Sequence, residues 1–236
     1  MGAADSLPPI ASLSQRFRRR RMERFAREFG LTPRTTVLDI GGTPDYWRLL
    51  TAPPRVVLLN MPRAMAETEG AEIRVAGDAC ALPFRDRAFD VVFSNSVIEH
   101  VGDRASQERF GREAARVGRG YWIQTPNRWF PVEQHLLTPF VHWLPAAWQR
   151  AIVPRWSVWS LTARVTPDRR EYFIRHCLEE VRLLGPRDMR RLFPGARLIR
   201  EHFLGFSKSL IAVEQASRSA AASPSPAAPR TEIKPD

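Results

Sequence analysis

The chain has 236 residues, 44% of them hydrophobic, so it is long enough to bury the core of one α/β domain with room for an insertion. It has no run of 18 or more apolar residues and no hydrophobic signal-peptide segment at its N-terminus, which predicts a cytoplasmic protein. The net charge of +11 is compatible with nucleic-acid binding, but 34 of the 36 basic residues are arginines spread along the chain, which favours a solvated face or an anionic-membrane contact instead. The two cysteines, Cys80 and Cys177, lack the paired spacing of a disulfide framework or a cysteine zinc site, in agreement with a reducing compartment.

The N-terminal region is predicted to be a flexible segment, residues 1–12, followed by a basic helix that ends at Gly30. We expect its apolar stripe to pack on the domain and its arginines to face outwards. The apolar residues at helical spacing are Leu13, Phe17, Met22, Phe25, Ala26 and Phe29.

Residues 36–47 are the stretch around which the rest of the chain is organised. A short apolar strand at 36–40 includes the acid Asp39, and Gly41 and Gly42 then break the strand before a helix begins. A buried strand that leads into a tight turn and a helix is the form in which α/β proteins hold nucleotide-like ligands. The turn lacks the G-x-G-x-x-G pattern of dinucleotide sites, because positions 43 and 46 are not glycine. An ordinary strand–turn–helix without a ligand is the alternative.

Four further apolar runs predict strands at 55–60, 72–76, 89–94 and 121–125, and Asp103 and Gly118 bound a helix at 104–117. Strands that alternate with helices or loops predict a parallel, doubly wound sheet with right-handed crossovers. The polar residues at the strand ends, which this sheet would gather at one edge, are Asp39, Asn60, Asp78, Asn95 and Asn127.

The composition changes after the fifth strand. Six of the seven tryptophans lie at 122–159, whereas residues 131–162 contain three charged residues. Repeated prolines exclude a single spanning helix, so we predict an aromatic-rich helical hairpin or lid as an insertion at about 128–170. It could extend the core, cover an apolar substrate or contact a membrane interface.

The C-terminal third is predicted to contain helices at 169–184 and 185–193 and a closing hairpin of strands at 196–203 and 208–214. The Ser/Ala/Pro-rich tail at 216–236 has too little hydrophobicity to fold and is predicted to be disordered, which leaves one folded domain at 13–215.

A linked series of motifs over roughly residues 30–214 resembles the class I S-adenosylmethionine-dependent methyltransferases, in the type 11 methyltransferase-domain group. The motifs are Val37–Gly42, Gly77–Ala79 with Leu82–Phe84, Phe89–Asp90 with Asn95–His100, and the terminal strand pair. The resemblance implies a doubly wound, mostly parallel, seven-stranded Rossmann-like sheet with the insertion after strand five. It implies S-adenosyl-L-methionine as cofactor and methyl transfer to a small or lipid-like acceptor. The alternative is a non-catalytic methyltransferase-fold protein that acts as a nucleic-acid-binding or scaffold module.

The resemblance also implies a cofactor site. The loop that follows the first strand would lie under the methionine part, the end of the second strand would reach the ribose, and Asp78 and the Ala79 amide would face the adenine. The chain departs from the family in two ways. Thr43, Pro44 and Asp45 make the end of the glycine loop stiffer and bulkier, and Asn60 stands where an acid is usual, so that a charged hydrogen-bond acceptor is lost. The implied cofactor residues are Asp39, Gly41, Gly42, Thr43, Asn60, Met61, Asp78, Ala79, Asn95 and Ser96.

His100 is the candidate general base by position, and a structural or positioning role for this histidine is the alternative. Glu99, His135 and Asn127 are further candidates. The sequence shows no full set of metal ligands beside the Glu99–His100 pair, so no metal is predicted. The scarcity of charge near the tryptophans suits an apolar acceptor, with a peripheral membrane contact as a further possibility, and the oligomeric state is left open. The predicted substrate-lid residues are Asn127, Trp129, His135 and Trp143.

Overall fold

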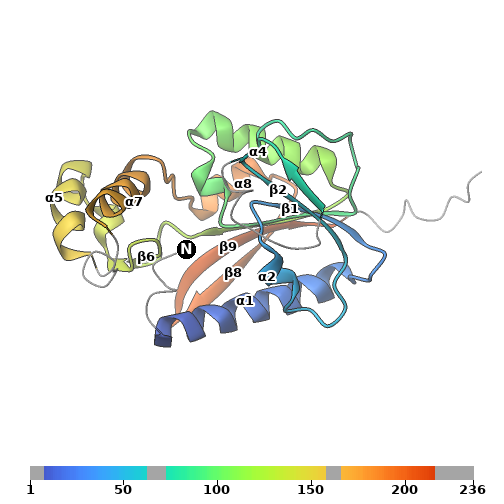
Figure 1. Ribbon diagram of the computed structural model, residues 1–236, viewed down its shortest axis with the longest axis horizontal. Helices are drawn as coiled ribbons and strands as arrows, with labels where there is room; N and C mark the ends of the chain where they lie inside the picture. The colour runs from blue at the N-terminus through green and yellow to red at the C-terminus, as the bar shows by residue number, and fades with distance from the viewer. Residues whose placement is uncertain (1–7, 63–72, 158–165, 216–236) are drawn as a thin grey trace, which may run out of the picture.

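The computed structural model describes residues 8–62, 73–157 and 166–215, and a seven-stranded sheet forms its centre (Figure 1). The strand order is β3-β2-β1-β4-β5-β9-β8. The strands are β1 (Thr36–Ile40), β2 (Arg55–Asn60), β3 (Ile73–Ala76), β4 (Val91–Asn95), β5 (Tyr121–Pro126), β8 (Arg197–Phe203) and β9 (Phe206–Glu214).

Strands β1 to β5 run parallel, whereas β9 lies antiparallel to both β5 and β8. The predicted mostly parallel, doubly wound seven-stranded sheet is confirmed, and so is the closing hairpin at its edge. Parallel order places the carboxyl ends of β1 to β5 at one edge of the sheet, and ligands of such sheets bind at that edge.

Helices cover both faces of the sheet, which gives three layers (Figure 1). One face packs against α4 and α8, and the other packs against α1 and α2. The helices are α1 (Pro8–Phe29), α2 (Pro44–Trp47), η2 (Ile98–His100), α4 (Arg104–Val117), η3 (Val141–Trp143), α5 (Ala146–Trp156), α7 (Pro167–Glu179) and α8 (Pro186–Leu192). No helix among the described residues has the length and apolarity needed to cross a membrane.

Local sequence explains where several helices begin or end. Helix α4 begins after Asp103, whose side chain accepts a hydrogen bond from the Ser106 backbone N–H at 2.9 Å, as expected of an N-cap. Helix α1 starts at Pro8, earlier than predicted, and is followed by Gly30 in the left-handed conformation. Helix α7 ends at Glu179, earlier than the predicted 184.

Helix α1 does not turn all of its arginines outwards, so that prediction is wrong for Arg21. This residue is 6% exposed and shares the inner face with Met22 and Phe25. Its Nε donates to Glu201 on β8 at 2.9 Å, and its Nη1 donates to Gln124 on β5 at 3.2 Å. Burial of this charge is tolerated because an acid and amide oxygens surround it.

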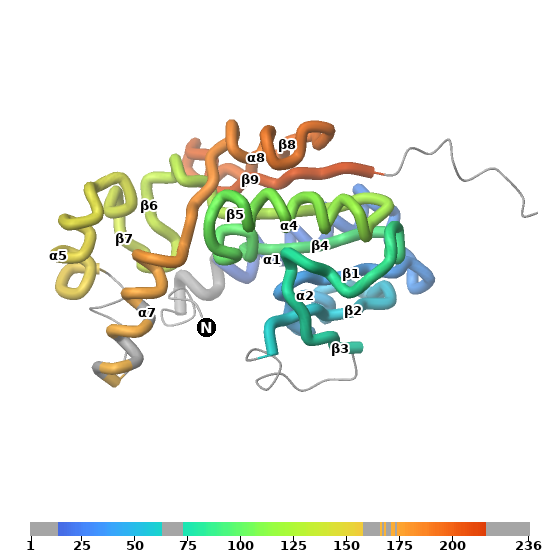
Figure 2. The backbone as a smooth tube through the Cα atoms, turned by 90° about the horizontal axis from the view of Figure 1, so that it is seen from above, coloured from blue at the N-terminus to red at the C-terminus, as the bar shows by residue number. Residues whose placement is uncertain are grey.

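The insertion after β5 forms a separate small unit beyond the carboxyl end of that strand (Figure 2). It contains a short antiparallel pair, β6 (Val132–Glu133) and β7 (Thr138–Pro139), followed by η3, α5 and α7. Four buried residues form its own core: Leu136, Val141, Val153 and Ile174. The insertion therefore contains the predicted helices together with an unpredicted β-hairpin; Trp159 lies outside the described residues.

Candidate functional site

A hollow of 410 Å³ opens at the carboxyl edge of the sheet, within the range of roughly 300–1,000 Å³ typical of small-molecule sites. Its walls come from the segments that follow β1, β2, β3 and β4, because these strands are parallel. We call it the sheet-edge hollow. Its lining residues are Ile40, Gly41, Leu59, Asn60, Met61, Gly77, Asp78, Ala79, Val97, His100 and Val101.

Gly41 and Gly42 shape the floor of this edge. Gly41 has φ +72°, and a Cβ there would lie 2.4 Å from Val97 Cγ2, so only glycine fits without strain. A Cβ on Gly42 would lie 1.7 Å from Asp39 Oδ2. The loop can therefore run close over the end of β1 only because both positions lack side chains.

Asp39 lies beneath that loop and does not line the hollow. It is 1% exposed, and its Oδ2 accepts a hydrogen bond from Trp47 Nε1 at 2.8 Å. Burial raises the pKa of Asp39 to about 7, although the bond from Trp47 acts in the opposite direction. The carboxyl group therefore supports the loop and the α2 turn from below.

Asn60 and Asp78 face the sheet-edge hollow from neighbouring strands. Asn60 Nδ2 donates to the Gly42 carbonyl oxygen at 3.0 Å, which ties β2 to the glycine loop. Asp78 Oδ1 accepts from the Cys80 backbone N–H at 2.8 Å, which fixes the turn after β3. Asp78 is exposed, so its carboxylate is accessible from the hollow.

Besides Asp39 and Gly42, which do not line this hollow, three further predicted cofactor residues lie away from it. Thr43 lines a second hollow of 590 Å³ between α1 and α2. Asn95 Nδ2 donates to Tyr46 Oη at 2.9 Å, and its Oδ1 accepts from Arg21. Ser96 Oγ lies 3.1 Å from Gln124 Oε1. The structure therefore groups Gly41, Asn60, Met61, Asp78 and Ala79 in one hollow and directs these others toward α1 and β5.

Sequence reasoning missed Arg21 as a contributor to this edge. A signal was present, because residues 17, 21 and 25 are spaced by four and share one face of a helix. Phe25 on that face packs against Trp47, Phe93 and Trp122 in the core. An arginine in line with the partly buried Phe17 and the fully buried Phe25 is a candidate for a buried charge.

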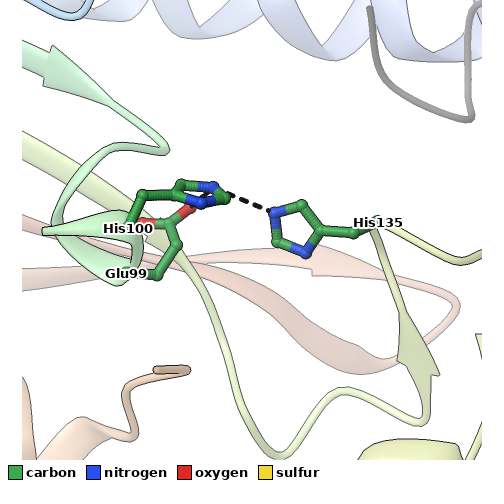
Figure 3. Close-up of side chains that lie close together, drawn as sticks. All are labelled: Glu99, His100 and His135. Carbon is green, nitrogen blue, oxygen red and sulfur yellow. Dashed lines mark hydrogen bonds and ion pairs between the residues drawn. The ribbon is translucent and has the colours of Figure 1, made fainter. Parts of the chain in front are cut away.

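A cluster of three titratable side chains lies beside the sheet-edge hollow, which one of them, His100, lines (Figure 3). Glu99 and His100 come from η2, and His135 comes from the turn between β6 and β7. Oxygen and nitrogen atoms of the three side chains all lie within 4.8 Å of one another. His100 Nε2 lies 3.2 Å from His135 Nε2, and Glu99 Oε1 lies 4.0 Å from His100 Nε2.

Burial dominates the acid–base behaviour of the η2 pair. It raises the pKa of Glu99 to about 7 and lowers the pKa of His100 to about 3, the latter with help from the neighbouring His135 and His176. A neutral His100 can accept or share a proton near neutral pH, but it is a weak base in this state. The lowered pKa of His100 therefore favours the alternative positioning role over the predicted general-base role.

Glu133 is a second residue that sequence reasoning missed. Its Oε1 lies 2.7 Å from His135 Nδ1, and its Oε2 accepts from the Leu136 backbone N–H at 2.6 Å. Burial alone would raise the pKa of Glu133 and lower that of His135. Their mutual contact outweighs burial, so the pKa of Glu133 is lowered and the pKa of His135 is raised. Glu133 also lines a hollow of 400 Å³ inside the insertion, which we call the insertion hollow.

The predicted lid residues have different surroundings. His135 meets His100 at the sheet-edge hollow, and Trp143 lines the insertion hollow while its Nε1 donates to the Arg128 carbonyl oxygen at 2.9 Å. Asn127 is buried, and its Nδ2 donates to the Ser207 carbonyl oxygen at 2.8 Å, so it anchors the start of the insertion. Trp129 is 60% exposed on the outer surface.

Residues 38–120 match the family described as a methyltransferase domain. A curated relative from Mycobacterium sp. (strain JLS), named an uncharacterized methyltransferase, is 36% identical over 92 residues, which cover 36% of this chain and 34% of the relative. The chain therefore spans about a third of the length of this curated relative. Residues 38–120 contain most of β1, all of β2, β3 and β4, and the residues that line the sheet-edge hollow.

Among solved structures, a putative zinc-dependent alcohol dehydrogenase from Rhodobacter sphaeroides is similar, with a TM-score of 0.53 and 13% identity over 84% of this chain and 89% of that one. A SAM-dependent methyltransferase from Methanosarcina mazei has a TM-score of 0.48 and 14% identity over 78% and 94% of the two chains. At such identities a structural likeness describes the fold alone.

Proposed function

We propose that this chain, whose residues 38–120 match the methyltransferase domain family, is a class I S-adenosylmethionine-dependent methyltransferase. In this proposal it binds that cofactor in the sheet-edge hollow and methylates a small or lipid-like acceptor. The observation that carries the proposal is the convergence of Gly41, Asn60, Asp78 and Ala79 on one hollow of adequate volume. These residues lie at the ends of β1, β2 and β3, where a doubly wound sheet binds its ligands.

The residues present fit the adenosyl part of the cofactor. Asp78 presents an accessible carboxylate oxygen, which can accept a hydrogen bond from an amino group. Gly41 allows a close backbone approach at the end of β1. Asn60, whose Nδ2 is used by the Gly42 carbonyl, has an amide oxygen that can accept from a hydroxyl.

When bound, S-adenosylmethionine supplies a methyl group that is already activated by its sulfonium. The protein then has to align the acceptor and exclude water. The cluster of Glu99, His100 and His135 lies between the sheet-edge hollow, which His100 lines, and the insertion hollow, which Glu133 lines. This arrangement supports an acceptor that approaches from the insertion.

A lipid-like acceptor and a peripheral membrane contact are supported by the surface of the insertion. Large aromatic side chains are exposed there beside two arginines that lie on α5, a combination favourable at a membrane interface. We use the name aromatic face for the exposed large aromatic side chains of the insertion: Trp129, Phe140, Trp143, Trp148, Trp156 and Tyr172.

The cofactor proposal is tested by titrating the chain with S-adenosylhomocysteine in a calorimeter. Asp78→Asn keeps an oxygen that can accept from the Cys80 N–H, but it replaces the charged acceptor and adds a donor that would face the adenine amino group. The loss of a charged hydrogen bond of about 1.5–3 kcal/mol predicts binding at least about tenfold weaker than in the unmodified protein.

Asp86→Asn is the matched control, because Asp86 is 76% exposed and its pair with Arg116 lies away from the hollow. This variant should bind like the unmodified chain. Absence of binding to the unmodified chain at millimolar ligand contradicts the proposal. Methyl transfer is then checked by mass spectrometry of lysate molecules that gain one methyl group in the presence of cofactor.

A further inference from the structure

We propose that Glu99, His100 and His135 bind a divalent metal ion of the Zn²⁺ type, held by Glu99 Oε1 and the two Nε2 atoms, with a fourth position open toward the sheet-edge hollow. The site combines η2 with the turn of the β6–β7 hairpin (Figure 3). Two imidazoles and one carboxylate with an open position are a donor set that catalytic zinc sites use.

The distances suit a tetrahedral ion. With Zn–N distances of about 2.0–2.1 Å, two tetrahedral nitrogen ligands lie about 3.3 Å apart. His100 Nε2 and His135 Nε2 are 3.2 Å apart. Glu99 Oε1 lies 4.0 Å from His100 Nε2, so a side-chain adjustment of less than about 1 Å would bring it to a Zn–O distance of about 2.0–2.2 Å.

A proton shared between the histidines would leave one atom of the cluster unsatisfied. Glu99 is fully buried, and its Oε2 accepts from Thr125 Oγ1 at 2.9 Å. Its Oε1 points into the cluster and has no hydrogen-bond partner among the described residues. A buried carboxylate oxygen without a partner is costly, and a cation in the cluster would satisfy it together with both Nε2 lone pairs.

The surroundings orient His135 as a metal ligand. Glu133 Oε1 lies 2.7 Å from His135 Nδ1, and a hydrogen bond from Nδ1–H directs the Nε2 lone pair toward His100. A carboxylate behind a ligating histidine is the usual support of protein-bound zinc. On the opposite side, the His176 ring stacks on the His100 ring with centroids 5.5 Å apart, which restricts the orientation of His100.

The position of the metal site suggests a role for the ion in methyl transfer, and this role rests on the proposed function. His100 lines the sheet-edge hollow and Glu133 lines the insertion hollow, so an ion here would lie beside the cofactor, where an acceptor that enters from the insertion could reach its open position. An acceptor oxygen bound at the open position would be polarised by the ion, which lowers the pKa of a hydroxyl group.

The experiment uses the full chain without an affinity tag, stripped with a chelator and titrated with Zn²⁺ against a chromophoric chelator. We expect one Zn²⁺ per chain, and Co²⁺ in its place should give the visible absorption of a tetrahedral site. His100→Gln and His135→Gln should each weaken Zn²⁺ binding at least tenfold, and Glu133→Gln should weaken it by about 10–100-fold through the orientation of His135.

His202→Gln is the matched control, because it makes the same chemical change at an exposed position on β8. It should bind Zn²⁺ like the unmodified chain. His100→Gln guards against unfolding, because within the described part of the chain the hydrogen bonds and ion pairs of the His100 side chain stay inside the cluster, whereas His135 also pairs with the buried Glu133.

Two results would overturn the metal site: no Zn²⁺ or Co²⁺ binding by the unmodified chain, or equal binding by the His100 and His135 variants. Binding of S-adenosylhomocysteine is measured on the same samples. Zn²⁺ binding without nucleoside binding would refute the proposed function and leave the metal site standing, and the reverse result would refute the metal site alone.

Discussion

Replacement of Asp39 by asparagine should remove a pH dependence from the stability of the fold. Asp39 is 1% exposed, and burial raises its pKa from 3.8 to about 7. Between these two values the folded chain binds more protons at this group than the unfolded chain, so the free energy of unfolding falls as the pH rises. The difference between the two pKa values, 3.8 and about 7, is worth about 1.4 kcal/mol per pH unit. The contribution of Asp39 to the free energy of unfolding therefore falls by about 4 kcal/mol in total, of which about 2.5 kcal/mol is lost between pH 5 and pH 8.

The assay is urea denaturation of both proteins without ligand at several pH values from 5 to 8. The asparagine oxygen can still accept from Trp47 Nε1, and the amide does not ionise. The stability of Asp39→Asn relative to the unmodified chain should therefore improve by about 2.5 kcal/mol from pH 5 to pH 8. The exposed Asp86→Asn serves as control and should follow the unmodified chain. If the free energy of unfolding of Asp39→Asn depends on pH in the same way as that of the unmodified chain, the buried carboxyl is not the source of that pH dependence.

Two further predictions concern the glycine loop and the aromatic face. Gly42→Ala should lower the free energy of unfolding by at least about 2 kcal/mol, because the new Cβ would lie 1.7 Å from Asp39 Oδ2. Gly195→Ala is the control and should change the free energy of unfolding by less than about 0.5 kcal/mol, because the nearest atom to its Cβ would be 3.7 Å away. Equal effects of the two substitutions in urea denaturation would contradict this reasoning. Trp148→Ser combined with Trp156→Ser should weaken binding to phosphatidylglycerol vesicles at least about tenfold, because these apolar side chains are 63% and 71% exposed. The control is Ile73→Ser, which removes an exposed apolar side chain on β3. Unchanged co-sedimentation of the tryptophan variant with the vesicles would exclude the aromatic face as the membrane contact.

Local patterns in the sequence were sufficient to place much of the sheet. The bounds of β1 and β2 follow from apolar runs that stop at a glycine or a polar residue, and α4 follows from Asp103 at its N-cap. These features depend on neighbours within a few positions, where backbone preferences and hydrogen bonds act directly. The grouping of Asn60 and Asp78 on one hollow could also be expected, because parallel strands bring their carboxyl ends together.

The cluster beside that hollow was decided by the tertiary structure alone. His100 and His135 are 35 positions apart, and they meet because the β6–β7 turn folds back against η2. Arg21 likewise finds Glu201 across 180 positions, because α1 packs over the sheet near β8. No periodicity encodes such contacts: they depend on how the faces of distant elements pack, which is a property of the whole chain. The sequence by itself determined the elements and their order along the chain, and packing determined which polar side chains meet between them.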